Sequence, residues 1–519
     1  MSSTTIRVLV TAAAAAIVIA TPAAPAANVF ASLDDFQVNS YTTGNQYVPR
    51  LGTTADGDFV VAWRGYDGDN VGVFARRVDT GGTVLGADFQ VNTYTTAGQY
   101  PWDVAPRADG GVVVVWGSAG QDGDGSGVFA QLVDSTGLAV GTEFQINTYT
   151  TGAQSPAKIA LAADGGFVAV WESYGQDGDG SGVFGQRLDS TGAPLGTEFQ
   201  INSYATSTQN NPVIAADEAG GFVVAWSSNG QDGDSFGIFA QRVDSVGAPV
   251  GTEFQINTYT TSGQARPGIA RAADGAFAIV WGSSGQDGDT GGVFGQRLDG
   301  TGVLVGTEFQ INTYTTSNQT LSRVAATPEG GFAVVWDSVG QDGSDGGVFG
   351  QRLDSAGAAV GAAFQVNAYT TGSQSLPRVR GATESGFLVV WSGSPDADGA
   401  GVFARRFVTL GAAGLDHFKC WKVKDLKNPK FAAVDALPLD DQFGVDDVDV
   451  KKPRLLCAPA DKDGSGINDP DTHQCCYKIK GAKLDPAQTL EVEDQFGTLQ
   501  FEIKKSDLLC QPCTKTLLP

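Results

Sequence analysis

The chain has 519 residues and a formal net charge of −24. Residues 28–415 carry 39 acidic and 17 basic side chains, whereas the sequence after residue 415 is nearly balanced. Such an acidic surface repels phosphate backbones, so nucleic acid is excluded as a partner. The length exceeds what one core serves, and at least two domains are expected.

Residues 1–27 resemble a signal peptide. Arg7 supplies a positive start, Val8–Ala20 is an apolar run, and Ala24-Pro25-Ala26 is a small-residue cleavage pattern. The run is short for a bilayer span, and the alternative is a retained N-terminal anchor. No later segment approaches about 20 apolar residues. We therefore expect an exported chain without a transmembrane segment once mature, located outside the cell, at its surface or in the periplasm.

Residues 28–412 contain one stretch of about 55 residues seven times over. Each copy begins with Phe-Gln-Val/Ile-Asn and later carries one Trp. The Phe positions are Phe36, Phe89, Phe144, Phe199, Phe254, Phe309 and Phe364. The Trp positions are Trp63, Trp116, Trp171, Trp226, Trp281, Trp336 and Trp391. A fixed period of this size is typical of a propeller or a solenoid.

Each copy predicts four short strands. In copy three the first three are residues 156–163, 167–172 and 183–189, and the fourth ends at 199–202; Asp-Gly and Ser-Thr-Gly hairpin turns follow the first and third strands, and residues 175–182 form a loop. The array opens on a single strand at residues 35–39 and ends one strand short after residue 406. The N-terminal strand can thus complete the last copy and close a ring, whereas a solenoid would need caps. The prediction is an all-β, seven-bladed β-propeller.

The pattern GGFVVVW…GQDGDGSGVFGQR…FQINTYTT resembles repeat arrays of large secreted bacterial proteins, often found beside hemolysin-type (RTX) calcium-binding repeats. The resemblance covers residues 33–410 and implies a repeat type without one activity. The chain lacks the GGxGxD nonapeptide of true RTX rolls, so their calcium chemistry does not carry over.

The loop between the second and third strands reads Gln-Asp-Gly-Asp-Gly in several copies. Its paired carboxylates offer hard oxygen ligands to Ca²⁺, although two Asp fall short of the six to eight oxygens that calcium takes. The alternative is a solvated Asp-Gly turn. The candidate calcium ligands of this loop are Asp122, Asp124, Asp177, Asp179, Asp232, Asp234, Asp287 and Asp289.

The loop between the fourth strand and the next copy carries Asn-x-Tyr-x-Thr-x-x-Gln. Aromatic faces and amides suit sugars, so these residues are candidate ligand-binding groups; the alternative is that they satisfy backbone groups at the crossing between blades. Both loop types are expected on one face of the disc. The candidates are Tyr94, Tyr149, Tyr204, Tyr259, Tyr314, Gln99, Gln154, Gln209, Gln264 and Gln319.

The remaining recurrent residues favour structure over catalysis. Trp at one strand position in every copy indicates packing between blades, and Arg187 with Asp189 is expected to form a repeated ion pair. The array has no His, Cys or Met, which excludes His triads and thiol nucleophiles. Glu172 and Asp337, which follow Trp in copies three and six, break the symmetry, but blades three and six lie apart on a ring. We assign no catalytic residue.

Residues 413–519 form a second domain with two similar halves, 416–462 and 472–515. An exported chain encounters an oxidising compartment, so disulfides are expected. Internal symmetry selects Cys420–Cys457 and Cys476–Cys510, and leaves Cys475 to pair with Cys513. His417 and His473 beside these Cys are metal ligands or structural strand residues. Asp461 and Asp463 begin an EF-hand-like loop that fails at position 12, where Thr472 stands, so a polar linker is the alternative to a weak calcium site. This half-repeat resembles an uncharacterised Cys-containing domain of secreted bacterial proteins.

Together these features predict an exported binding or scaffold protein that uses one face of a propeller, with Ca²⁺ as the candidate cofactor. The expected partner is an extracellular protein or a glycan, and the expected state is a monomer. A lectin-like propeller is the first alternative and a secreted hydrolase the second.

Overall fold

The computed structural model describes the backbone of residues 29–32, 34–396 and 399–410 and of seven strands between 417 and 513, and the side chains of residues 34–394 and 399–408. The predicted signal peptide and the loop with Asp461 and Asp463 lie outside the described residues. The chain divides into two units, Met1–Thr409 and Leu410–Pro519. None of the described residues forms a helix that is long and apolar enough to cross a membrane.

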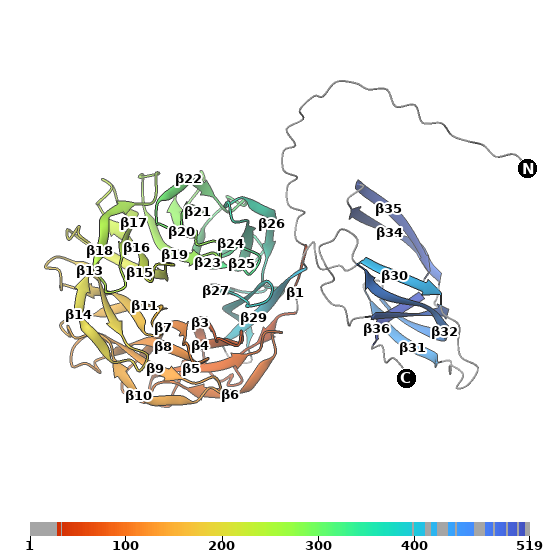
Figure 1. Ribbon diagram of the computed structural model, residues 1–519, viewed down its shortest axis with the longest axis horizontal. Helices are drawn as coiled ribbons and strands as arrows, with labels where there is room; N and C mark the ends of the chain where they lie inside the picture. Colours follow the sequence, from red (N-terminus) through yellow and green to blue (C-terminus); the bar gives the residue numbers. More distant parts are fainter. Residues whose placement is uncertain are drawn as a thin grey trace, which may run out of the picture. The chain divides into compact units, whose positions relative to one another are not determined.

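The first unit is a seven-bladed β-propeller (Figure 1). Blades one to three consist of β3 (Tyr47–Thr53), β4 (Phe59–Tyr66), β5 (Val71–Val78) and β6 (Val84–Gln90); β7 (Gln99–Pro106), β8 (Val112–Ala119), β9 (Ser126–Val133) and β10 (Ala139–Gln145); and β11 (Gln154–Leu161), β12 (Phe167–Tyr174), β13 (Ser181–Leu188) and β14 (Pro194–Gln200). Blades four to six consist of β15 (Gln209–Ala216), β16 (Phe222–Asn229), β17 (Phe236–Val243) and β18 (Pro249–Gln255); β19 (Gln264–Arg271), β20 (Phe277–Ser284), β21 (Gly291–Leu298) and β22 (Leu304–Gln310); and β23 (Gln319–Ala326), β24 (Phe332–Val339), β25 (Gly346–Leu353) and β26 (Ala359–Gln365). Each of these blades is an antiparallel sheet with its strands in chain order.

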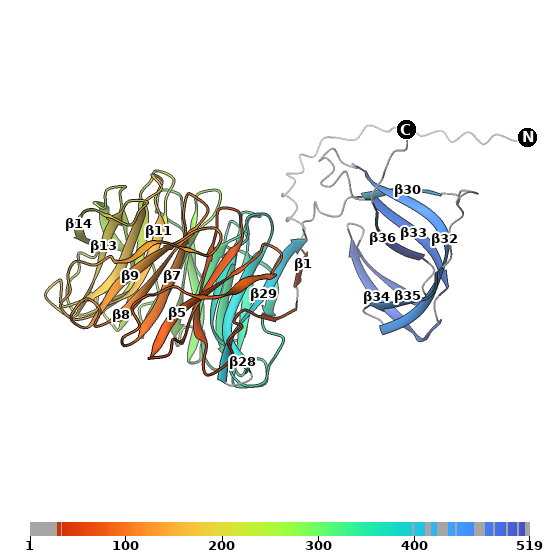
Figure 2. The same ribbon diagram turned by 90° about the horizontal axis from the view of Figure 1, so that it is seen from below.

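The first strand of each blade faces the axis of the ring and the last lies at its rim (Figure 1). Figure 2 shows the ring from the side, with strands of neighbouring blades running through its thickness. The second strands are buried on both faces, as the apolar run Phe167–Trp171 predicts. One core cluster joins Val113 of blade two to Trp171 of blade three, and all seven repeat Trp side chains are at most 2% exposed. Each Trp therefore fills the wedge between two blades.

Blade seven closes the ring by combining both ends of the array. It contains β27 (Ser375–Gly381), β28 (Phe387–Asp396) and β29 (Gly399–Leu410), and β29 pairs with the N-terminal strands β1 (Val29–Ser32) and β2 (Phe36–Gln37). Phe36 lies opposite Ala404 in an antiparallel register. The lone N-terminal strand thus removes the free edge of the last blade, as its sequence pattern predicts.

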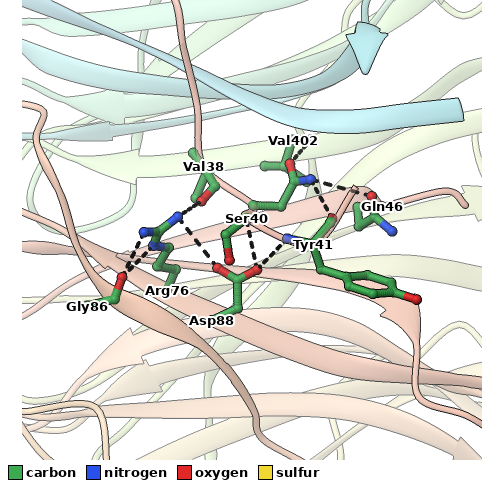
Figure 3. Close-up of polar contacts among 9 residues, drawn as sticks. Val38, Ser40, Tyr41, Gln46, Arg76, Gly86, Asp88 and Val402 are labelled. Carbon is green, nitrogen blue, oxygen red and sulfur yellow. Dashed lines mark hydrogen bonds and ion pairs between the residues drawn. The ribbon is translucent and has the colours of Figure 1, made fainter. Parts of the chain in front are cut away.

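A carboxylate clasp links successive blades at the residue before each Phe-Gln signature. In blade one, Asp88 accepts hydrogen bonds from the backbone N–H groups of Ser40 (2.8 Å) and Tyr41 (3.2 Å), and its other oxygen lies 3.6 Å from Arg76 (Figure 3). Arg76 also donates to the Val38 carbonyl. Equivalent acceptors in the other blades are Asp35, Glu143, Glu198, Glu253 and Glu308.

Copy six lacks this clasp because Ala363 stands at the position of the carboxylate. We predict that Ala363→Glu raises the melting temperature by about 1–2 °C, since it adds a charge-assisted bond worth about 0.5–1 kcal/mol at a partly exposed site. Thermal melts at low salt measure this. The control Glu253→Ala removes an existing clasp and is expected to lower the melting temperature. The prediction is wrong if Glu253→Ala destabilises the protein but Ala363→Glu does nothing.

The second unit is also all β. Its five-stranded sheet has the order β30 (His417–Lys422), β32 (Gly444–Ala460), β33 (His473–Lys480) and β36 (Leu508–Cys513), and β31 (Val434–Asp441) pairs with β32. A separate hairpin joins β34 (Lys483–Asp494) and β35 (Gly497–Lys505).

The backbone register of this unit brings together the cysteines that the internal symmetry paired. Cys420 lies opposite Cys457, and Cys476 lies opposite Cys510. Cys513 lies opposite His473, two residues from Cys475 along the same strand. The three disulfide bonds themselves stay a prediction.

Candidate functional site in the central channel

The inner strands of all seven blades line a cavity of about 160 Å³ on the axis of the propeller. Six of the 17 basic residues of the repeat array contribute to its wall, and Asp103 is the only carboxylate among the described residues that line it. With every group ionised, the wall carries six positive charges and one negative charge. The six bases are Arg50, Lys158, Arg266, Arg323, Arg378 and Arg380.

Most of these charges share one position of the repeat. The residue four places after the buried Gln that opens each inner strand lies near the middle of that strand. In copies one to seven this position holds Arg50, Asp103, Lys158, Val213, Gly268, Arg323 and Arg378. Closing the ring brings residues more than 300 positions apart onto one axis. This site was missed in the sequence, although its signal is visible: one position varies strongly in an otherwise regular repeat.

The channel cations are crowded and only partly neutralised. Both Arg50 Nε and Lys158 Nζ donate to the Trp102 carbonyl, at 2.8 and 2.9 Å. Asp103 lies 3.3 Å from Lys158 Nζ and 3.9 Å from Arg380. One carboxylate thus lies close to two bases, which come from blades three and seven. Arg323 and Arg378 bond instead to the neighbouring carbonyls of Ser322 and Pro377.

Burial and mutual repulsion lower the basicity of this cluster. Desolvation, reinforced by the nearby guanidinium groups, lowers the pKa of Lys158 to about 7 even though Asp103 opposes the shift. Desolvation likewise lowers the pKa of Arg50 to about 9 and that of Arg323 to about 10. The pKa of Arg378 is lowered well below its ordinary value, again first by desolvation. An anion bound among these groups would relieve the repulsion.

The wall also holds a donor without a partner. Arg378 Nε is buried and makes no hydrogen bond to any described residue. Such an atom costs free energy unless a ligand or solvent satisfies it. The side chain of Lys158 is still 24% exposed, so the interior of the channel is reachable from solvent. The cluster is therefore placed to accept an anion from solution.

Asp337 lies beside this cluster. Its Oδ2 accepts a hydrogen bond from the Leu376 N–H at 3.2 Å, and Oδ1 is buried without a partner among the described residues. Desolvation raises its pKa to about 7, against the opposing fields of Arg378 and Arg323. Desolvation also raises the pKa of Glu172 to about 7. The two carboxyls belong to blades three and six, which are not neighbours, so nothing in the topology brings them together as a pair.

Five inner strands carry a residue with left-handed backbone two places after the opening Gln. These residues are Val48, Asn211, Arg266, Leu321 and Leu376, with φ between 53° and 59°. In four of them the backbone N–H donates to a side chain of the preceding blade: Val48 to Ser392 (3.1 Å), Asn211 to Glu172, Arg266 to Ser227 (3.0 Å) and Leu376 to Asp337. Strained backbone of this kind concentrates at ligand sites.

The structure places the Tyr and Gln candidates in one turn. The Gln side chains are at most 1% exposed, with Gln154 accepting from Asn147 and donating to the Thr151 carbonyl. Asn147 donates to the Tyr149 carbonyl as well. Both ends of each amide are therefore used to shape the crossing between blades. The five candidate Tyr side chains (Tyr94, Tyr149, Tyr204, Tyr259 and Tyr314) are half-buried in the same turns, and Gln99, Gln209, Gln264 and Gln319 repeat the bonds of Gln154.

The Asp residues of the Gln-Asp-Gly-Asp-Gly loop meet the following Tyr turn. Asp124 Oδ2 accepts from the Gly152 N–H at 3.0 Å, and this bond, with one from Gly125, holds the pKa of Asp124 below its usual value. Asp179, Asp234 and Asp289 make the same contact with the next turn. The first Asp of each pair, at Asp122, Asp177, Asp232 and Asp287, approaches the Asn amide. No group of three potential metal-ligating side chains occurs among the residues the structure describes.

Calcium would have to compete with these backbone bonds. We therefore expect that calcium titrated into EDTA-treated protein shifts the melting temperature by less than about 1 °C, because the carboxylates already have partners. Titration calorimetry with a melting curve at each end measures this. Uptake of several ions together with a clear rise in melting temperature would contradict the expectation and make these loops metal sites.

The expected pair of Arg187 with Asp189 is wrong. Arg187 lies 2.6 Å from Asp164, in the turn between the first two strands of its own blade. Asp189 instead accepts the Thr191 and Ala193 N–H groups and caps its turn. Asp-Gly turns and Ser-Thr-Gly turns each use their own Asp locally, so the Arg reaches across the sheet.

Fold and site together define an all-β propeller with a cationic central channel. The sequence matches no protein-family model and no curated protein. Among solved structures, a protein of unknown function from Dyadobacter fermentans is similar with a TM-score of 0.46 and 10% identity, over 73% of this chain and 99% of that one.

Two further solved structures are similar to the propeller. An α-L-arabinanase from Penicillium chrysogenum, complexed with arabinobiose, has a TM-score of 0.43 and 12% identity over 74% of this chain and 99% of its own. The polysaccharide lyase Uly1 has a TM-score of 0.46 and 10% identity over 72% and 92%. At these TM-scores, the similarities carry no argument about what this chain binds.

Proposed function

We propose that this chain is an exported binding protein that holds a small anionic ligand in the central channel of its propeller. The observation that carries the proposal is the concentration of six of the array's 17 basic residues around one cavity, in a chain whose net charge is −24. Like charges are normally dispersed over a surface, because bringing them together in a partly desolvated site is costly. Guanidinium groups bind carboxylate, sulfate and phosphate with two parallel hydrogen bonds, so such ligands offset that cost.

The acidic exterior gives this arrangement a selective effect. Extended polyanions such as nucleic acids are repelled by the overall charge, whereas a small anion that enters the channel meets a positive wall. The residues that would contact it come from five blades, which makes the intact ring a requirement for binding.

Calorimetric titration of the full exported chain at low salt tests the proposal. Sulfate, D-glucuronate and citrate are expected to bind, with affinity falling as sodium chloride is added, because screening weakens charge–charge attraction. Glucose is the neutral control and should not bind measurably under the same conditions. Absence of heat for all three anions, or equal binding of glucose and glucuronate, would contradict an anion site.

A secreted hydrolase is not favoured by the arrangement of carboxyls. Glycoside cleavage uses two carboxyls roughly 5–10 Å apart, on the two sides of one bond. Glu172 and Asp337 have the raised pKa of general acids, but each sits against a different inner strand, near Asn211 and Leu376. Turnover of a glycan that is lost in both Glu172→Gln and Asp337→Asn would favour this alternative.

A further inference from the structure

A second hollow opens where the two ends of the array meet. It has a volume of about 310 Å³ and lies between blade seven and blade one. Six of the nine described residues that form it have polar, uncharged side chains, most of its surface is nonetheless apolar, and none of these residues carries a charge. Its hydroxyl and amide groups belong to Asn45, Tyr47, Ser373, Ser375, Ser392 and Ser394.

The repeat is shortened on both sides of this seam. The length of the loop can be measured as the number of positions between the Trp of a copy and the first buried Val or Ile of its third strand. In copies two to six this spacing is 12 positions, as from Trp116 to Val128. The spacing is 10 positions in copy one, from Trp63 to Val73, and 11 positions in copy seven, from Trp391 to Val402. The Gln of the Gln-Asp-Gly-Asp-Gly loop is missing from both short copies. The seam is therefore the one place where the loops that cover this face are reduced in two adjacent blades.

The polar groups of this seam hollow are held in place by backbone contacts. Ser392 Oγ accepts the Val48 N–H at 3.1 Å, and Asn45 Oδ1 accepts the Ala400 N–H at 3.0 Å. The Arg64 guanidinium lies over the Tyr47 ring, with Cζ 4.8 Å from the ring centroid, and the same Cζ lies 4.5 Å from the centroid of the Tyr100 ring. An ordered set of hydroxyls, one amide and one fixed aromatic ring matches a sugar, whose hydroxyls donate and accept and whose ring face packs on an aromatic side chain.

The seam hollow and the cationic cavity share two inner strands. On β3, Tyr47 lines the seam hollow and Arg50 lines the cationic cavity. On β27, Leu376 lines the seam hollow and Arg378 lines the cationic cavity. The separation is three residues on β3 and two on β27, which corresponds to about 7–10 Å of strand, a distance that a disaccharide spans. We propose that the seam hollow is a neutral sugar subsite, and that the ligand of the channel is an acidic saccharide with its carboxylate among the arginines. This inference rests on the proposed anion-binding function.

The subsite can be tested by filling the seam hollow with a larger side chain that other copies of the repeat already carry at the same position. Ser375 occupies the position where copies one and two carry Tyr47 and Tyr100, so Ser375→Tyr is compatible with the blade. The matched control is Ala265→Tyr at the same position of blade five. Titration calorimetry compares D-glucuronate with a disaccharide in which glucuronate is linked to a neutral hexose, using the full exported chain and both variants.

The disaccharide is expected to bind the unmodified protein at least 10-fold tighter than glucuronate alone. Ser375→Tyr should abolish this gain and leave glucuronate affinity unchanged, whereas Ala265→Tyr should alter neither. Glucuronate binding without any gain for the disaccharide, or a gain that survives Ser375→Tyr, would overturn the subsite while leaving the anion site intact. Failure of both acids to bind would overturn the anion site as well.

Discussion

Replacing Arg323 and Arg378 together with glutamine is expected to weaken anion binding by at least about 100-fold. Each guanidinium would contribute a charge-assisted hydrogen bond of about 1.5–3 kcal/mol to a bound carboxylate or sulfate. The two side chains come from neighbouring inner strands, and Arg378 has the unpartnered buried Nε. Calorimetry with sulfate at low salt measures the loss.

The same double variant is expected to melt at the temperature of the unmodified protein or above it. Neither arginine bonds to a carboxylate in the channel, and both lose solvent and repel other cations there. Removing them therefore removes an unfavourable term from the folded state. A residue cluster that existed for stability would behave in the opposite way, so a melting temperature lowered by more than a few degrees would contradict a binding role.

A matched control separates the channel from net charge. Arg187→Gln with Arg242→Gln changes the net charge by the same two units but acts on third strands, away from the cavity, where the arginines pair with Asp164 and Asp217. This control is expected to leave sulfate affinity within about twofold. If both double variants weaken binding equally, the effect is general electrostatics and the channel is not the site.

Affinity for an anion of constant charge is expected to fall by about 10- to 100-fold between pH 6 and pH 8. Lys158, with a pKa of about 7, is charged at pH 6 and neutral at pH 8. Asp337, also with a pKa of about 7, is neutral at pH 6 and negative at pH 8. Both changes make the channel less positive as pH rises, and each is worth on the order of 1 kcal/mol. Sulfate is the suitable probe because it stays fully ionised over this range.

Two substitutions test which residues cause the pH dependence of sulfate affinity. Lys158→Met and Asp337→Asn should each remove part of the slope, and the double variant should bind sulfate with almost equal affinity at both pH values. The charged groups that face them are Asp103 and the arginines at 50, 323 and 378. A slope that persists unchanged in the double variant, or a slope of opposite sign in the unmodified protein, would contradict the assignment.

Stability should report the titration of Asp337 independently of any ligand. Its folded pKa lies above its unfolded value, so the folded state holds an extra proton between about pH 4 and pH 7, and stability is lost as pH rises through 7. Asp337→Asn should therefore raise the melting temperature relative to the unmodified protein at pH 8, raise it less at pH 5, and have little effect below about pH 4. Equal shifts at pH 5 and pH 8 would show that the carboxyl does not titrate in this range.

Much of the fold follows from local patterns that repeat. Doubly apolar strands such as Phe167–Trp171, hairpin turns such as Asp164-Gly165, and a fixed period determine the blade and the number of blades. The ring closes because the array begins with one extra strand and ends one strand short. The N-terminal strand β2 pairs with β29 and forms hydrogen bonds with the backbone groups at its free edge. The blade depends on neighbours within about 55 residues, and the closure is indicated by a strand pattern that is left over at one end of the array and missing at the other. Both can be predicted without knowing where any blade lies.

The candidate site depends on contacts that no local pattern contains. The most regular residues of the repeat are the obvious candidates in the sequence. In the structure, however, Gln154 and Asp124 use their polar groups in hydrogen bonds to the backbone of the turns beside them. Arg50 and Arg378, by contrast, stand at a position that looks irregular in the sequence. Only the ring makes that position the wall of a channel.

The sequence by itself determined an all-β repeat protein with seven blades and a second, Cys-containing domain. The tertiary structure alone decided that the charge of the channel is opposite to that of the whole chain. The physical reason is that a closed ring brings equivalent positions of all copies together at its axis, whatever their separation along the chain. A few substitutions at one repeat position then act as a single cluster, although each is isolated in the sequence.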